Sequence, residues 1–262
     1  MNGDLSRRAF LAGAAAIGLV ACSGSSAPRA ESSSSTNGSS GPGTTSSGSA
    51  TSSAAPSGPA RFVETGPRGR NEVALTFHTS GDDARISELL DVLAAHKTVM
   101  TAFIVGQWLD ANLELGRQLH EAGHELANHT YTHPSFATLK PTAMADEVAR
   151  CRAAIAHIVP DGGVLFRPSG TADGTGTPPA AVLAAAGGGG YPTVLGFDVD
   201  PFDYQDPGAD AVANRTIAGL HDGAIVSLHF DHPGTITALP RILDAVASAG
   251  LTPVTASKLL SS

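Results

Sequence analysis

Short apolar runs alternate with longer amphipathic stretches from about residue 61 to the end of the chain. The runs are rich in Val, Ile, Leu and Phe, which is typical of strands buried in a parallel sheet. We expect a turn leading into a short strand at 123–127. Further strands are expected at 72–77, 99–105, 164–166, 193–199, 224–229 and 252–254.

Between these runs, apolar side chains recur at every third or fourth position, which predicts helices. Ile86, Leu89 and Leu93 form one such stripe. Because strands and helices alternate, the sheet is predicted to be parallel. About seven repeats in roughly 200 residues favour a closed or nearly closed β/α barrel over an open sheet. The other helices are expected at 113–122, 142–158, 178–186, 209–220 and 236–249.

The first residues have the features of an export signal. Arg7 and Arg8 precede an apolar run at 12–21, which resembles a twin-arginine signal. The run is too short to span a bilayer, since a spanning helix needs about 20 residues. Residues 19–22, Leu-Val-Ala-Cys, resemble a bacterial lipobox. We therefore expect residues 1–22 to be a lipoprotein signal peptide ending at lipidated Cys22, and the protein to be exported and anchored on the outer face of the cytoplasmic membrane.

Residues 23–60 consist almost entirely of Ser, Gly, Thr, Pro and Ala. Such a segment cannot bury enough apolar surface to offset the entropy lost on ordering, so it is predicted to be a disordered tether. Residues 61–262 have the size of one domain.

The chain is acidic, with a formal net charge of −8, and it has no cluster of basic residues. This excludes nucleic acid as an expected partner, and membrane contact is expected only through the lipid on Cys22. With Cys22 modified, Cys151 is left without a partner for an intrachain disulfide. Cys151 lies on the apolar stripe of a predicted helix, so a buried packing role is expected. We expect a monomer.

Polar side chains gather at the ends of the predicted strands. His129 and His133 lie three residues apart, and Pro134 disfavours helical geometry at His133, so this pair belongs to a strand-to-loop segment. Alone, such a pair is a weak indication of a metal site. In a β/α barrel, however, the carboxyl ends of the strands share one face, where active sites form. Other strand ends contribute His78, Arg167, Asp200, Asp203 and His229.

These segments resemble the motifs of the polysaccharide deacetylase family, whose members carry a NodB homology domain. The family motif His-Ser/Thr-x-x-His is matched at 129–133, and its Arg-Pro loop is matched by Phe-Arg-Pro-Ser-Gly at 166–170. Its Asp-centred motif is matched at 199–204, and its last motif, which ends in His, at 225–229. The resemblance covers about residues 72–260. It implies a distorted (β/α)7 barrel and a hydrolase that uses a divalent metal, held by one Asp and two His, to remove acetyl groups from N-acetylated sugars.

The resemblance also implies roles for single residues. His129 and His133 would bind the metal, Zn²⁺ by expectation, and His229 would be the general acid. Arg167 and Asp200 would form a charge pair that orients the site, with an ordinary structural ion pair as an equally weighted alternative. The backbone N–H of Gly170 would stabilise the oxyanion.

The first motif departs from the family. The family has Thr-Phe-Asp-Asp-Gly, whereas residues 76–79 are Thr-Phe-His-Thr. His78 thus replaces the base carboxylate and Thr79 replaces the ligand carboxylate. A threonine hydroxyl is a poor substitute for a carboxylate on zinc.

Three arrangements remain open at this motif. Asp82 binds the metal and His78 is the base, or His78 is itself the third ligand, or the site holds no metal and does not hydrolyse. We favour the first. Asp82 and Asp83 also suit the N-cap of the following helix, so one of them is expected to cap it.

Several other side chains are secondary candidates. His232 lies close to the barrel face, with Asp231 as a candidate to orient it. The aromatic residues Trp108, Tyr131, Phe202 and Tyr204 flank the expected site and are candidates for stacking on sugar rings, with core packing as the alternative.

The sequence therefore predicts a lipid-anchored, metal-dependent hydrolase of carbon–nitrogen bonds other than peptide bonds, with a cell-envelope or extracellular polysaccharide such as peptidoglycan as substrate. Two alternatives stay open. One is a catalytically silent glycan-binding lipoprotein, and the other is an O-acetyl esterase on the same scaffold.

Overall fold

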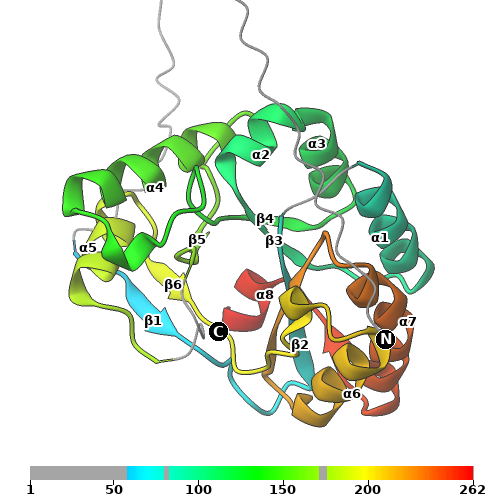
Figure 1. Cartoon of the computed structure of the whole chain (residues 1–262). Helices are drawn as coiled ribbons and strands as arrows, with labels where there is room; N and C mark the ends of the chain where they lie inside the picture. The colour runs from blue at the N-terminus through cyan, green and yellow to red at the C-terminus, as the bar shows by residue number, and fades with distance from the viewer. Residues whose placement is uncertain (1–57, 80–82, 171–175, 262) are drawn as a thin grey trace, which may run out of the picture. The chain divides into compact units, whose positions relative to one another are not determined.

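The computed structural model describes residues 58–79, 83–170 and 176–261 (Figure 1). The expected signal peptide, Cys22, all but the end of the tether and Asp82 lie outside these ranges. Within them, no helix is long and apolar enough to cross a membrane.

A parallel sheet forms the centre of the described domain. Its strands follow the order β1-β6-β5-β4-β3-β2-β7, and β8 pairs with β2. Every strand pairing is parallel, as the alternation of strands and helices predicts. The strands are β1 (Arg61–Val63), β2 (Glu72–His78), β3 (Thr101–Ile104), β4 (Glu125–Asn128), β5 (Leu165–Phe166), β6 (Thr193–Leu195), β7 (Ile225–His229) and β8 (Thr252–Pro253).

The sheet curls because the chain that follows β6 leaves β1 and β5 and reaches β7. At Thr193–Leu195, β6 lies between β1 and β5. Further on, Val199 forms a parallel bridge with Val226 of β7. The hydrogen bond from Ser227 N–H to the Val199 carbonyl measures 2.9 Å. This contact brings the chain after β6 against the strand at the far end of the sheet, which gives the predicted distorted β/α barrel.

Helices surround the curled sheet in Figure 1, while α8 lies across its interior. The α8 N-terminus is tied to the first residues of two strands, because Ala256 N–H donates to Thr101 Oγ1 (2.7 Å) and Ser257 N–H to Glu125 Oε2 (3.1 Å). Helix α8 therefore closes the N-terminal end of the barrel and leaves the other end for a site. The helices are α1 (Asp83–Ala95), α2 (Gly106–Ala111), α3 (Leu113–Glu121), α4 (Pro141–Ile155), α5 (Ala180–Gly188), α6 (Ala209–Gly219), α7 (Pro233–Ser248) and α8 (Ala256–Leu260).

Alternation along the strands separates two faces of the sheet. On β2, Leu75 and Phe77 belong to the large cluster packed beneath the helices, whereas Ala74 belongs to a cluster inside the barrel. Thr76 and His78 therefore point into the barrel like Ala74. The buried members of the interior cluster are Ala74, Phe103, Ala127, Leu165, Leu195, Phe197, Ile225, Ala256 and Leu259.

Strand β1, the helices α2 and α8, and two short 3-10 helices, η1 (Phe136–Thr138) and η2 (Asp203–Gln205), were not expected from the sequence. Strand β1 and helix α8 lie at the two ends of the described domain, and the short helix α2 directly follows the β3 segment. Helix α7 also begins at Pro233, three residues earlier than expected, because proline suits the first turn of a helix. Cys151 is buried, as predicted, and its thiol donates a hydrogen bond to the Ile104 carbonyl.

Candidate active site

A pocket of about 680 Å³ lies at the carboxyl ends of the strands. It contains every predicted catalytic or metal-binding residue that the structure describes; Asp82 is outside the described ranges. The lining residues are His78, Thr79, Val105, Trp108, His129, His133, Arg167, Pro168, Gly170, Phe197, Asp200, Tyr204, Ser227 and His229.

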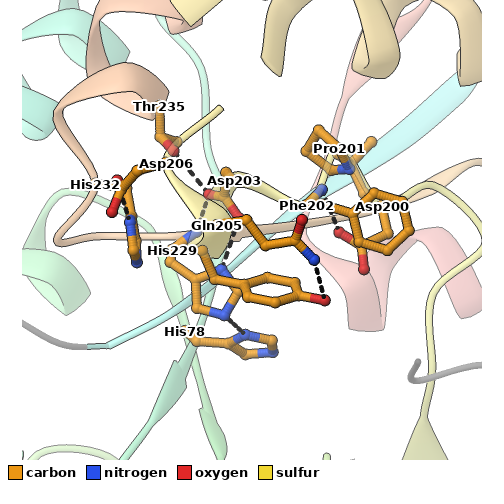
Figure 2. A network of polar contacts seen from close by, with 12 residues as sticks. His78, Asp200, Pro201, Phe202, Asp203, Gln205, Asp206, His229, His232 and Thr235 are labelled. Carbon is orange, nitrogen blue, oxygen red and sulfur yellow. Dashed lines mark hydrogen bonds and ion pairs between the residues drawn. The ribbon is translucent and has the colours of Figure 1, made fainter. Parts of the chain in front are cut away.

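A chain of hydrogen bonds runs through one wall of this pocket. Figure 2 shows the part from Asp203 through His229 to His78. Asp203 Oδ1 lies 2.8 Å from His229 Nδ1, and His229 Nε2 lies 2.8 Å from His78 Nδ1. His78 Nε2 in turn lies 3.0 Å from an NH1 group of Arg167. The strands place the two histidines together, since His78 and His229 are direct partners in the β2–β7 register.

The chemistry of the chain's ends fixes where its protons lie. A guanidinium can only donate, so His78 Nε2 must accept from Arg167 and His78 carries its proton on Nδ1. That proton is donated to His229 Nε2, and His229 donates its own Nδ1 proton to Asp203. Burial lowers the pKa of His78 well below its usual value, and the neighbouring His129, His229 and Arg167 lower it further. His78 is therefore a neutral bridge.

This bridge bears on the two roles considered for His78. His78 Nδ1 carries the proton that is donated to His229, and the ring lone pair, on Nε2, accepts from Arg167, so no lone pair faces a metal or a water in this arrangement. His78 acts as a base or a ligand only if its contact with Arg167 or His229 first breaks.

Asp203 orients His229 by accepting hydrogen bonds from its ring and its backbone. Its side chain is 1% exposed, and its Oδ2 accepts hydrogen bonds from the His229 backbone N–H and from Thr235 Oγ1, both 2.7 Å long. The sequence placed Asp203 at a strand end but gave it no role. The signal was present, because Asp203 lies only three residues after Asp200 in the same motif.

Arg167 is buried, and among the described residues its hydrogen-bond partners are neutral groups. Nε donates to the Leu195 carbonyl (3.0 Å), NH2 to the Gly196 carbonyl (2.9 Å) and NH1 to Thr76 Oγ1 (2.9 Å). Its guanidinium also stacks over the Phe103 ring, 3.9 Å from the ring centroid. Burial lowers its pKa to about 9.

Arg167 and Asp200 form no direct ion pair in the described part of the chain, but they interact at longer range, because the Asp200 charge partly offsets the effect of burial on the pKa of Arg167. Asp200 Oδ1 instead accepts a 2.8 Å hydrogen bond from the Phe202 N–H. Burial raises the pKa of Asp200, and Asp203 raises it further. Of the residues that line the pocket, Asp200 is the one carboxylate within the described ranges.

His129 is oriented as metal-binding histidines commonly are. Its Nδ1–H donates to the Arg167 carbonyl (2.9 Å), which leaves Nε2 with the lone pair that a metal needs. The ring stacks on His78 with centroids 4.3 Å apart and lies 5.0 Å from the His133 ring. Burial lowers the pKa of both His129 and His133, so both are neutral at pH 7, which is the ligand form.

These two imidazoles fit a divalent cation, but the described residues supply no third ligand. Thr79 uses its hydroxyl within the protein, accepting from the Val105 N–H (2.9 Å) and donating to the Phe103 carbonyl (3.4 Å). No group of three His, Cys, Asp or Glu able to hold a metal occurs in the described ranges. Asp82, the expected third ligand, lies outside these ranges.

The secondary candidates divide into two groups. Trp108 and Tyr204 line the pocket, and Phe202 is 40% exposed beside it. Tyr131 is not among the lining residues, because its hydroxyl donates to Asp110 (2.8 Å) and Arg150 stacks on its ring.

The remaining candidates are held by neighbours. His232 bonds to Asp206 at 2.8 Å, and Asp231 pairs with Arg85 at 3.5 Å, so Asp231 does not orient His232. Gly170 lines the pocket at a φ of 62°. A side chain there would meet the backbone of residues 134 and 135 at under 3 Å.

Comparison with known proteins supports the resemblance seen in the motifs. The sequence profile of the polysaccharide deacetylase family matches residues 65–186. The chitooligosaccharide deacetylase of Bradyrhizobium sp. (strain ANU 289) is 34% identical over 165 residues, which are 63% of this chain and 73% of that protein. The peptidoglycan-N-acetylglucosamine deacetylase of Bacillus cereus is 30% identical over 198 residues, or 74% of this chain and 90% of that protein.

A solved structure shares the fold. It is a mutant, with restored enzymatic activity, of a CE4 family pseudoenzyme from Bacillus anthracis. The TM-score is 0.70 at 25% identity, with 77% of this chain and 71% of the other covered. Together with the sequence matches, this shows that the chain belongs to the polysaccharide deacetylase family.

Proposed function

We propose that this protein is a hydrolase that removes N-acetyl groups from a cell-envelope or extracellular polysaccharide, with peptidoglycan as the foremost candidate. The observation that carries the proposal is the pocket in which the metal-type pair His129 and His133 shares one wall with a histidine oriented by a buried carboxylate, His229 on Asp203. The named activities of the two curated relatives support the same substrate class.

We propose further that a divalent cation, Zn²⁺ by donor preference, binds His129 and His133, with Asp82 as the third ligand. Bound there, it would supply an activated water and polarise the acetyl carbonyl. His129 Nε2 is available for this role because Nδ1 is held by the Arg167 carbonyl.

His229 is the proposed proton donor to the leaving amine. Once protonated on Nε2, it has no acceptor in His78, because Arg167 keeps the His78 proton on the facing Nδ1. Two donors then face each other, so the contact breaks and the His229 proton is directed into the pocket. Asp203 stabilises the imidazolium through Nδ1–H.

The base that takes the water proton is a carboxylate in this scheme. His78 was the expected base, but its engaged nitrogens favour another group. Asp200 lines the pocket, and burial raises its pKa above the usual value for an aspartate, which is the direction that favours a general base. Asp82 is the other candidate if it does not bind the metal.

Acetate release is the test of the function. The purified protein is incubated with N-acetylglucosamine oligomers and with peptidoglycan, with chelator, and with chelator followed by added Zn²⁺. We expect acetate to appear, to be lost with chelator and to return with Zn²⁺. Acetate release that is unaffected by chelator would contradict the metal part of the proposal but would leave the proposed hydrolase activity standing.

A glycan-binding role is the second candidate, and the absence of both first-motif carboxylates favours it. It predicts no acetate from any glycan, together with measurable binding of the same oligomers by calorimetry. Release from O-acetylated but not N-acetylated glycans would instead assign an O-acetyl esterase.

A further inference from the structure

A buried carboxylate outside the pocket holds the loop between the two proposed metal ligands. Glu147 lies on α4 with 8% of its surface exposed. Its Oε2 accepts from the backbone N–H groups of Tyr131 and Thr132, both at 2.8 Å, and its Oε1 accepts from Thr132 Oγ1 at 2.7 Å. All three bonds therefore go to the two residues in the middle of the segment from His129 to His133.

This loop needs an external support because its backbone is strained. Thr130 has a φ of 70° and His133 a φ of 58°, and this left-handed region is sterically unfavourable for residues other than glycine. Strand β4 ends at Asn128, so the N–H groups of residues 131 and 132 have no strand partner there. Glu147 provides the acceptors that the sheet no longer provides.

Other contacts hold the loop at atoms other than the 131 and 132 N–H groups. The Thr130 and Tyr131 carbonyls accept from the N–H groups of Gly106 (3.0 Å) and Gln107 (2.9 Å). Asn128 Oδ1 accepts from the Thr130 N–H (2.9 Å), and His129 is held through its ring by the Arg167 carbonyl. His133 precedes Pro134, which restricts its backbone further. Glu147 supplies the acceptors for the two N–H groups that these contacts leave, in the turn that leads from His129 to His133.

We propose that Glu147 is a positioning residue that holds the 129–133 loop in the shape that turns both imidazoles into the pocket. The inference rests on the proposed function, because it treats His129 and His133 as ligands of one cation. It concerns geometry rather than charge. A glutamine at this site can accept both N–H groups with its oxygen and donate from its amide to the Thr132 hydroxyl.

The experiment separates the effect of the shape of the residue 147 side chain from the effect of its charge. Zn²⁺ affinity is measured on metal-free protein by competition with a chromophoric chelator, for the natural chain and for Glu147→Ala, Glu147→Gln and Glu114→Ala. We expect Glu147→Ala to weaken Zn²⁺ binding at least about 10-fold, the scale of supporting contacts around metal ligands. Glu147→Gln should stay within about 3-fold. Glu114 is the control, since it is a surface glutamate on α3 that pairs with Arg117 at 3.8 Å.

A second readout needs no metal. Hydrogen exchange of the residue 131 and 132 amides is followed by NMR in metal-free protein, alongside the thermal midpoint. We expect Glu147→Ala to lose protection at these two amides, and Glu147→Gln to keep it. If Glu147→Ala does not fold, Glu147→Asp, which retracts the carboxylate by one methylene, takes its place with the same expectation.

The outcomes separate the two proposals. A folded Glu147→Ala protein with unchanged Zn²⁺ affinity and unchanged amide protection would overturn the role of Glu147 and leave the proposed function standing. Equal losses in the Ala and Gln variants would also overturn it, because charge rather than geometry would then matter. If the natural chain binds no Zn²⁺, the metal proposal fails, and amide protection alone decides whether Glu147 holds the loop.

Discussion

At the residue scale, Asp203 decides how the proton-transfer side of the pocket works. It accepts from the His229 ring, from the His229 backbone and from Thr235, and it is almost fully buried. A carboxylate with these three donors fixes both the direction and the tautomer of the imidazole. His78 can therefore donate to His229 only while Asp203 keeps the His229 proton on Nδ1.

Asp203→Asn tests this arrangement. If the asparagine oxygen keeps its contacts with the His229 backbone and Thr235, its NH2 group faces Nδ1 and shifts the imidazole proton to Nε2. The proton on Nε2 would then face the Nδ1–H of His78. Because two donors cannot form a hydrogen bond, the His229 ring would change its orientation. We expect kcat for acetate release to fall by about 100-fold or more, the usual scale of general acid–base catalysis.

Asp206→Asn is the matched control, because Asp206 holds the neighbouring His232 in the same way. It should leave kcat within about 2-fold. Nitrogen-15 NMR of the imidazoles reports the tautomer directly. An Asp203→Asn protein with a natural rate and an unchanged His229 tautomer would contradict the assignment.

At the element scale, a buried histidine joins the residues that directly precede two neighbouring strands. His124 precedes β4, and its Nδ1 accepts a 3.3 Å hydrogen bond from the Met100 N–H just before β3. Burial lowers its pKa from 6.5 to about 4. The folded barrel therefore keeps His124 neutral at a pH at which the unfolded chain already binds a proton.

Between pH 6.5 and about 4 the unfolded state holds more protons at His124, so the free energy of unfolding falls as the pH falls. One histidine contributes up to about 1.4 kcal/mol per pH unit in this window. His124→Gln keeps an acceptor for Met100 N–H but cannot titrate, so we expect a shallower slope in denaturant unfolding from pH 7 to 4.

His120→Gln is the control for that measurement, since His120 is an exposed histidine at the end of α3. It should leave the slope unchanged. Equal slopes for the natural chain and His124→Gln would show that His124 is not buried in its neutral form.

Most helices and strands of the barrel followed from the spacing of apolar residues, because that spacing directly reports burial. Elements without a clear spacing of apolar residues could not be predicted in this way. Strand β1 has only three residues, and α8 has only five. Elements this short are held by contacts far along the chain, such as Thr101 with Ala256, which no local pattern records.

At the scale of the whole molecule, the barrel is proposed to be exported and joined to the membrane by a tether of Ser, Gly and Pro residues ending at lipidated Cys22. A tether of this composition behaves as a flexible coil. It would let the pocket search for glycan at some distance from the bilayer without a fixed orientation.

Cys22→Ala tests the anchor. Without the acceptor for the lipid, we expect the protein to leave the membrane fraction and to appear in the soluble exported fraction, which cell fractionation and immunoblotting measure. Cys151→Ala is the matched control and should stay with the membrane, because Cys151 is buried in the barrel. Membrane retention of the Cys22→Ala protein would contradict lipid anchoring.

The sequence by itself determined the strand–helix alternation and the strand ends that carry His78, His129, Arg167 and His229, because periodicity and motif spacing are local properties. Tertiary structure alone decided which of these side chains touch. The register of β2 on β7 sets His78 against His229, and closure at Val199 brings the loop with Asp203 behind it. Hydrogen-bond direction depends on such contacts, so only the fold shows His78 as a neutral bridge between Arg167 and His229.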